Sequence, residues 1–284
     1  MTKAPTGTAP TDPRPLPKLV IEPKGGAVEW LELWRFRDLF LILAERDIRL
    51  RYRQTALGVV WVILQPLIAS LIFAAIFGLF AKLPSDGTPY LLFVFASMLP
   101  WNLFSNGVQR GGNSLLRDAG LITKIYFPRP IIPIASVAAV LLDFAVATVV
   151  MFALMLLYGI APSWSVLTLP GLVLLTLAVT VGMSFLFSAL SVYYRDFFYA
   201  LPFILQVWMY ASPVVYSSSL VPEKWQLLYG LNPMVGVIDG FRWALLGSPA
   251  PTTTLVESIV ISTLMLVGGA VVFKRVERSF ADVI

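Results

Sequence analysis

The sequence contains no cysteine and no histidine among its 284 residues. Without cysteine there are no disulfides and no thiol nucleophile. Without histidine there is no Cys/His zinc site, no Ser–His–Asp triad and no HExxH metalloprotease motif. The dipeptide Gly-Lys is also missing, which removes the phosphate-binding loop of P-loop ATPases, and no DxD pair occurs. These absences predict that the chain is not an enzyme and holds no metal or cofactor.

Charge is scarce as well, since only 13% of the residues are Asp, Glu, Lys or Arg while 58% are hydrophobic. A soluble domain of this size needs more charge on its surface. A membrane-spanning helix needs about 20 predominantly apolar residues. Five stretches lack any charged residue, and they are 54–81, 87–109, 144–194, 197–222 and 258–273. The composition therefore predicts an all-α polytopic membrane protein.

The apolar runs predict six transmembrane helices in one domain, residues 29–284. A proline-rich segment, 1–28, precedes this domain and predicts a disordered cytoplasmic tail. Residues 30–43 have the pattern of an amphipathic helix that lies at the membrane interface, in contact with lipids. Residues 231–247 are too short to cross the bilayer and are broken by Pro233, Asp239 and Arg242, which predicts a re-entrant or interfacial hairpin between spans five and six. The six spans are expected at 56–81, 88–109, 131–158, 165–192, 197–216 and 253–273.

The distribution of Lys and Arg predicts the orientation. With the N-terminus inside, eighteen of the 21 basic residues fall on the cytoplasmic side. Only Lys82, Lys224 and Arg242 fall outside. Both termini are therefore expected in the cytoplasm. The net charge of +5 is explained by this topology and does not indicate a nucleic-acid partner.

A basic cluster stands immediately before the first span, and it consists of Arg46, Arg49, Arg51 and Arg53. The cluster fits a cytoplasmic-edge anchor of the positive-inside type. Arg46, Arg49 and Arg53 would also share one helical face, where they could bind lipid phosphates or a polyanionic substrate. Within the spans, Asp143 is the main ionisable residue, and it fits either a packing or intersubunit hydrogen bond or a direct role in transport.

The cytoplasmic loop between the second and third spans predicts a short amphipathic helix at 114–125. Leu115, Ala119 and Ile122 form an apolar stripe, with Leu121 and Ile125 beside it. Such a helix fits a groove on a soluble partner, and it also fits a helix that lies flat on the membrane.

Aromatic residues crowd the chain from Tyr193 to Tyr210. An interfacial belt and core packing explain aromatic residues of this kind in membrane proteins. Flat aromatic faces along a path would also suit sugar rings, which present apolar C–H faces. The candidate path residues are Tyr52, Trp61, Gln65, Tyr193, Tyr194, Tyr199 and Phe203. Pro66, next to Gln65, is expected to loosen the first span.

Seven blocks follow one another from Tyr52 to the C-terminus, within a resemblance that begins at about residue 29: YRQTALGVVWVILQPL, PYLLFVFASMLPWNLFSN, NSLLRDAGLITKIYFPRPIIP, YYRDF, SPVVYSSSLVPEKW, LNPMVGVIDGFRWALLG and RVERSFADVI. Together they resemble the permease subunit of ABC-type polysaccharide exporters, which transport O-antigen, teichoic acid and related polyol-phosphate polymers. The proline-rich start lies outside the resemblance.

The resemblance implies a homodimer of this chain with two copies of a separate ABC ATPase, which binds the ATP and Mg²⁺. Residues 114–125 correspond to the coupling helix that docks on the ATPase, with Leu115, Arg117, Asp118, Leu121, Ile122, Lys124 and Ile125 as its contact residues. Residues 213–247 correspond to the short helices that close the outer mouth. The expected substrate is a lipid-linked polysaccharide, O-antigen-like or teichoic-acid-like, exported across the bacterial inner membrane.

Three alternatives stand beside this reading. An ABC exporter permease for a drug or a lipid shares the six-span plan but should lack most of the quoted blocks. A secondary transporter would need inverted repeats and more intramembrane charge. A membrane enzyme would need a catalytic group, and the sequence offers none.

Overall fold

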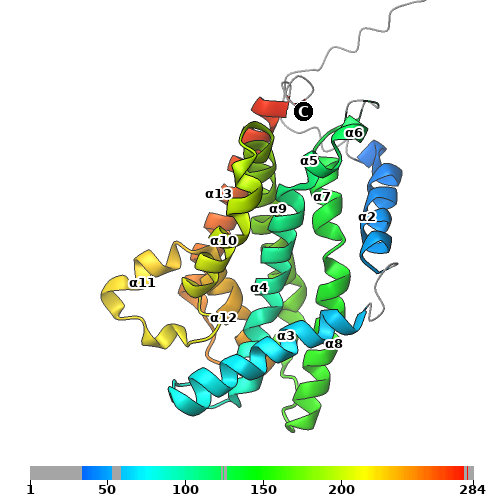
Figure 1. Cartoon of the computed structure of the whole chain (residues 1–284). Coiled ribbons are helices and arrows are strands. Elements are labelled where there is room, and N and C mark those ends of the chain that lie inside the picture. Colours follow the sequence, from blue (N-terminus) through cyan, green and yellow to red (C-terminus); the bar gives the residue numbers. More distant parts are fainter. Residues whose placement is uncertain (1–33, 53–58, 123, 125–126, 278–279, 281–284) are drawn as a thin grey trace, which may run out of the picture.

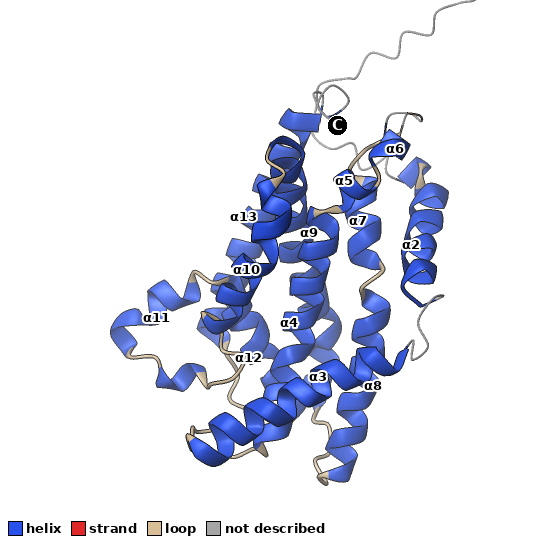
Figure 2. Cartoon of the chain, viewed as in Figure 1, coloured by secondary structure: helices blue, strands red, loops and turns tan. Residues whose placement is uncertain are grey.

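The computed structural model describes residues 34–52, 59–122, 124, 127–277 and 280. All of the regular structure in these ranges is helical, as Figure 2 shows. The tail at 1–28, Arg53 and Ile125 lie outside the described residues. The elements are α2 (Arg37–Tyr52), α3 (Val59–Phe73), η1 (Ala74–Phe80), α4 (Tyr90–Gly112), α5 (Ser114–Arg117), α6 (Ala119–Ile122), α7 (Ile131–Ala138), α8 (Leu141–Leu157), η2 (Trp164–Thr168), α9 (Leu169–Tyr193), α10 (Asp196–Tyr210), η3 (Ser218–Leu220), α11 (Glu223–Gly230), α12 (Pro233–Leu246) and α13 (Thr252–Val276).

Five helical segments are long and apolar enough to cross a membrane, namely Val60–Phe80, Tyr90–Gly112, Ile131–Leu157, Trp164–Tyr193 and Thr252–Val276. They match five of the six expected spans to within a few residues. The remaining expectation, a span at 197–216, corresponds to α10, which has only 15 residues. At 1.5 Å per residue α10 is about 22 Å long, short of the ~30 Å hydrocarbon core. It ends just before Ser212-Pro213, because the residue before a proline disfavours the helical conformation.

The core of the bundle is built around α4 and α9, and α9 packs against both α4 and α13. The contact between α9 and α13 depends on two glycines. A Cβ atom at Gly182 would lie 2.5 Å from the carbonyl oxygen of Met265. A Cβ atom at Gly269 would lie 2.1 Å from the carbonyl oxygen of Gly182. Small residues at these two positions let the helix backbones approach closely, as they do in other membrane proteins.

Two elements at the N-terminal side differ from expectation. The helix expected at 30–43 is seen as α2, which continues through the basic residues to Tyr52 and packs against α7. Its first expected turn, 30–33, lies outside the described residues. α3 crosses the bundle obliquely instead of running alongside α4 (Figure 1). Pro66 lies inside α3 without ending it, and the wider π-helical turns of η1 begin only at Ala74.

The loop between α4 and α7 also differs from the single helix expected at 114–125. It forms two one-turn helices, α5 and α6, which are separated by Asp118. Gly120 in α6 lowers the intrinsic helix propensity of this stretch. Both turns lie at the same end of the molecule as the end of α13, since the backbone N–H of Arg129 donates to Glu277 Oε1 at 3.3 Å. The fold therefore gathers the loop, α2 and the end of α13 on one side.

Candidate functional site

A charged network connects α2 to the loop of α5 and α6, and Asp47 is at its centre. The Asp47 side chain is buried and accepts hydrogen bonds from three donors. Arg46 Nη2 donates to Oδ1 at 2.9 Å, while Arg117 Nη2 and the Ser136 hydroxyl donate to Oδ2, each at 2.9 Å. These residues come from α2, α5 and α7. The carboxylate therefore holds three elements together.

Arg46 extends the network to Asp118, whose Oδ2 accepts from its Nη2 at 2.8 Å. Burial works against the charge of Arg46, but the hydrogen bonds to Asp118 and Asp47 outweigh it, so the pKa of Arg46 is raised. The guanidinium remains charged at every physiological pH. Arg117 of α5 and Asp118, which follows it, thus tie the loop to Asp47 and Arg46 of α2.

The apolar stripe expected to dock on a partner packs into the chain's own interior instead. Leu115 and Ile122 are buried in an apolar cluster with Leu43 and Phe127. Arg117 and Asp118 face the charged network, and Leu121 is partly buried. The exposed tip of the loop carries Gly120 and Lys124. The physical reason is that Leu115 of α5 and Ile122 of α6 are buried against Leu43 of α2 and Ile131 of α7, so this apolar surface is already covered within the chain.

The three described arginines of the basic cluster, Arg46, Arg49 and Arg51, each form an ion pair with an acid of this chain. Arg46 belongs to the charged network, and Arg49 forms an exposed i, i+4 ion pair with Glu45. Arg51 pairs with Asp143. Two residues of the expected phosphate-binding face, Arg46 and Arg49, are thus already paired with acids of this chain, and the third, Arg53, lies outside the described residues.

Asp143 lies at the start of α8 and is paired from α2. It forms an ion pair with Arg51 and accepts a hydrogen bond from the Tyr52 hydroxyl. Burial and the Asp143 carboxylate raise the pKa of Tyr52 to about 12, so its phenol remains a neutral donor. The sequence did not reveal these partners of Asp143, because they lie far from it along the chain, Tyr52 by 91 residues.

A polar cavity of about 220 Å³ adjoins this pair, between α3, α4 and α8. Gln65 and Asn106 line it together with Arg51 and Asp143. A cavity with these amide and charged groups, placed among membrane-spanning helices, is a functional candidate by its chemistry. Of the expected path residues, Gln65 lines this cavity. Tyr52 donates a hydrogen bond to Asp143, which also lines it.

The expected aromatic path residues lie elsewhere on the molecule. Tyr199 and Phe203 form one exposed face of α10 with Gln206, opposite the buried Leu201 and Leu205. Tyr193 and Tyr194 are exposed at the end of α9, and Trp61 is exposed on α3. Within one chain, the residues that line the polar cavity do not include these aromatic side chains.

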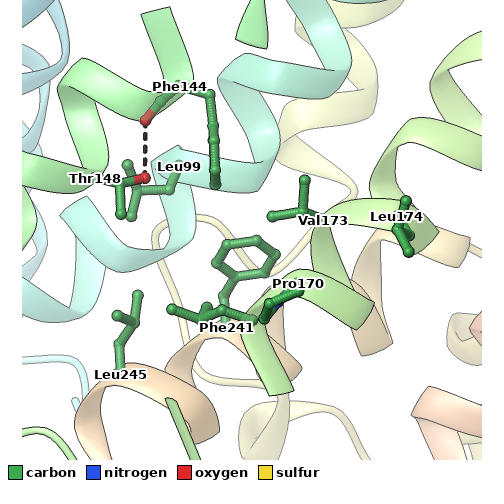
Figure 3. Close-up of a pocket in the computed structure, with 9 residues that line it drawn as sticks. Leu99, Phe144, Thr148, Pro170, Val173, Leu174, Phe241 and Leu245 are labelled. Carbon is green, nitrogen blue, oxygen red and sulfur yellow. Dashed lines mark hydrogen bonds between the residues drawn. The ribbon is translucent and has the colours of Figure 1, made fainter. Parts of the chain in front are cut away.

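A second cavity, of about 440 Å³, is apolar and lies between α4, α8, α9 and α12. Figure 3 shows Leu99, Phe144, Phe241 and Leu245 turned toward it. Its one hydroxyl, on Thr148, donates at 2.8 Å to the carbonyl oxygen of Phe144 and is therefore already used. The crevice suits hydrocarbon and offers no group for chemistry or for a sugar.

The role of Arg242 was not evident from the sequence, where it is one of three basic residues on the outer side of the expected topology. Its side chain is fully buried, donates to Ser97 Oγ at 2.8 Å and pairs with Asp239 at 3.2 Å. It also donates to the carbonyl oxygens of Pro213 and Tyr216, and its guanidinium lies 3.7 Å from the centre of the Phe93 ring. Burial lowers the pKa of Arg242 to about 10, against the opposing effect of Asp239, so it stays charged. The signal in the sequence was an Asp and an Arg three residues apart on an otherwise apolar helix.

Arg242 thereby fixes α12 to α4 and to the segment after α10. No group of three or more His, Cys, Asp or Glu side chains that could hold a metal ion is found in the described part of the chain. The polar groups of the described sites are ion pairs and amides, with aromatic faces beside them, and these groups can bind a ligand through hydrogen bonds and ring contacts.

Comparisons with known proteins agree with this picture. The model of the ABC-2 type transporter family matches residues 38–246. The chain is 28% identical over 254 residues to the O-antigen export system permease protein RfbA of Myxococcus xanthus, covering 88% of this chain and 97% of that protein. It is 26% identical over 248 residues to RfbA of Klebsiella pneumoniae, covering 87% and 95%. It is 25% identical over 206 residues to the polysialic acid transport protein KpsM of Escherichia coli, covering 71% and 78%.

A permease of this family works with an ABC ATPase subunit, so the hydrolysis of ATP is the task of the partner. The family match covers most of the chain, and five segments are suited to cross a membrane. The chain therefore belongs to the ABC-2 type transporter family, as a multi-span permease subunit of the bacterial inner membrane and not an enzyme in its own right.

Proposed function

We propose that this permease exports a lipid-linked polysaccharide, O-antigen-like or teichoic-acid-like, across the bacterial inner membrane. The observation that carries the proposal is the similarity to O-antigen export permeases over nearly the whole length of both chains. The second similarity, to polysialic acid transport proteins, concerns another polysaccharide. A permease for a drug or a lipid is the alternative.

We further propose a complex of two copies of this chain and two copies of the ATPase. The exposed faces of the single chain support the dimer. α3 buries little of its surface within the chain, and α10 exposes Tyr199, Phe203 and Gln206 on one face. A lipid-facing surface would be purely apolar, whereas an amide on such a face suits a partner copy or a polar path. In this arrangement α10, extended by the segment to 216, makes the fifth of the six crossings, and α11 and α12 lie at the outer mouth.

The loop of α5 and α6 is the proposed contact with the ATPase. Its exposed tip, Gly120 and Lys124, would touch the partner, while the buried Leu115 and Ile122 hold the loop to the permease. Arg117 and Asp118 would transmit a displacement of the tip to α2 and α7 through Asp47. In this proposal, the coupling element is the whole rigid unit and not the apolar stripe alone.

The proposed path for the polymer uses the aromatic face of α10. Contact between a sugar and an aromatic ring is non-directional, so it can pass from one sugar to the next. We expect Tyr199→Ala and Phe203→Ala to reduce surface polymer several-fold without lowering the yield of the complex, because both side chains are largely exposed in the single chain. Surface polymer, complex yield and basal ATPase rate are measured.

Leu264→Ala is the matched control, because Leu264 is equally exposed but lies on the apolar outer face of α13. Phe198 is a poor control because its ring centre lies 5.3 Å from that of Tyr199. If export from the two aromatic variants equals export from the Leu264 variant, the aromatic path is wrong.

Deletion of the gene tests the proposed substrate. We expect the deletion strain to accumulate a lipid-linked glycan inside the cell and to lose the same glycan from its surface. Chemical analysis of the lipid-linked glycans in both fractions makes the comparison, and expression of the chain restores the surface glycan. An unchanged surface polysaccharide with altered efflux of a drug or a lipid would support the alternative instead.

A further inference from the structure

A polar pocket of about 640 Å³ lies at the end of the molecule opposite the charged network, beside α11 and α12 (Figure 1). It is formed by Asp86 from the loop before α4, by residues 217–219, by α11 and α12, and by the loop that leads into α13. The expected topology places all of these segments on the outer side of the membrane. Its size lies within the range of about 300–1,000 Å³ that is usual for ligand pockets.

Hydroxyl groups dominate the lining, since three consecutive serines, 217–219, and three consecutive threonines, 252–254, contribute to it. Asp86, Asp239 and Arg242 are the charged residues of the lining. The charge of Asp239 is matched by Arg242 at 3.2 Å. The Asp86 carboxylate accepts from the Ser217 hydroxyl at 2.8 Å and forms no ion pair with a described residue. The pocket is therefore rich in hydrogen-bonding groups and carries one unmatched negative charge.

Ser248 provides an independent sign of a ligand. Its Oγ atom is buried, lines this pocket and has no hydrogen-bond partner among the described residues. A buried hydroxyl without a partner is costly, and such groups in native proteins usually satisfy their hydrogen-bonding capacity with a ligand or with water. Asp86 also has unused lone pairs, because an ionised carboxylate can accept about four hydrogen bonds and this one accepts from Ser217 alone.

We propose that this pocket binds a neutral, hydroxyl-rich segment of the exported polymer as it leaves the membrane, with Asp86 and Ser248 among its contact groups. The proposal rests on the proposed function. Sugar hydroxyls both donate and accept, so they can donate to the Asp86 carboxylate and pair with the Ser248 hydroxyl. A phosphate or another anion does not fit, because the unmatched charge of Asp86 repels it.

The absence of cysteine from the chain allows a direct test in cells that make their own polymer. Thr253, which lines the pocket, is replaced by cysteine in the full-length protein, assembled with its ATPase. Labelling by a membrane-impermeant maleimide is timed in spheroplasts that synthesise the polymer and in spheroplasts that lack its first glycosyltransferase. We expect the polymer to slow the labelling of Thr253→Cys.

Ser163→Cys is the control, since Ser163 is exposed in the loop between α8 and η2, outside the pocket. Its labelling rate is expected to be the same in both strains. Adding Ser248→Ala to Thr253→Cys should weaken the protection by about fivefold, the effect of one hydrogen bond. The Ser248 variant should fold normally, because its hydroxyl has no partner in the protein to lose.

Equal labelling of Thr253→Cys in the two strains would overturn the proposal. Equal protection with and without Ser248→Ala would also overturn it. A polymer that passes the outer mouth without binding in the pocket would shield Thr253→Cys whether or not the Ser248 hydroxyl is present. Surface polymer is measured in the same cells. Normal surface polymer without protection of Thr253→Cys refutes the pocket and leaves the proposed function intact. Surface polymer that persists unchanged in the deletion strain refutes the proposed function.

Discussion

Replacing Arg242 by leucine is expected to lower the thermal unfolding midpoint of the purified permease by roughly 10 °C. The guanidinium is buried, and its removal leaves Asp239 without its ion-pair partner and leaves the carbonyl oxygens of Pro213 and Tyr216 without a donor. Breaking a buried pair by removing one partner costs about 3–5 kcal/mol. The measurement is the unfolding midpoint of the full chain in detergent.

Lys224→Leu is the matched control for Arg242→Leu. Lys224 is also on the outer side of the expected topology, but it is exposed and its ammonium group lies 5.9 Å from the ring of Trp225. The Lys224→Leu variant loses one positive charge, as Arg242→Leu does, and its unfolding midpoint should stay close to that of the wild type. A similar small change for both variants would show that Arg242 does not hold α12 in place.

Replacing Asp47 by alanine is expected to have the largest effect of any substitution in the charged network. Asp47 is the shared acceptor of Arg46, Arg117 and Ser136, and its side chain is only 3% exposed. Its loss leaves two arginines with Asp118 as their remaining acid in the network, at a cost of about 3–5 kcal/mol. Because α2, α5 and α7 meet at this carboxylate, we expect loss of co-purification with the ATPase together with a lower unfolding midpoint.

Glu45→Ala serves as the control on the same helix. Glu45 and Arg49 form an ion pair whose side chains are 59% and 69% exposed, and an exposed pair contributes only ~0–1 kcal/mol. The Glu45 variant should therefore retain its stability and its ATPase. Asp47→Asn adds a test of charge, since it keeps the shape of the side chain. Full ATPase binding by the alanine variant would contradict the role of the network.

The sequence predicted those parts of the fold that depend on local composition. Five spans appear within a few residues of their expected bounds, because a run of about 20 apolar residues suffices to define each of them. The span expected at 197–216 differs, because the chain leaves the helical conformation before Pro213 and α10 has only 15 residues. The hydrophobic run at 197–216 carries no sign of this other than that proline.

Contacts between residues far apart in the sequence could not be predicted. Asp143 has no basic neighbour along the chain, and its partners Arg51 and Tyr52 reach it only because α2 folds back along α7. The amphipathic stripe at 114–125 was recognised, but the side it faces depends on α2 and α7, which bury Leu115 and Ile122. Periodicity identifies an apolar face, and only the tertiary structure identifies what covers it.

Reconstituted transport tests the central claim most directly. The permease and its ATPase are inserted together into proteoliposomes that contain the lipid-linked glycan isolated from the deletion strain, and a glycan-specific enzyme supplied on the far side of the membrane detects the polymer that has crossed. The account predicts that the glycan crosses only when ATP, Mg²⁺ and both subunits are present. ATP hydrolysis by the assembled complex without any movement of the glycan would contradict it.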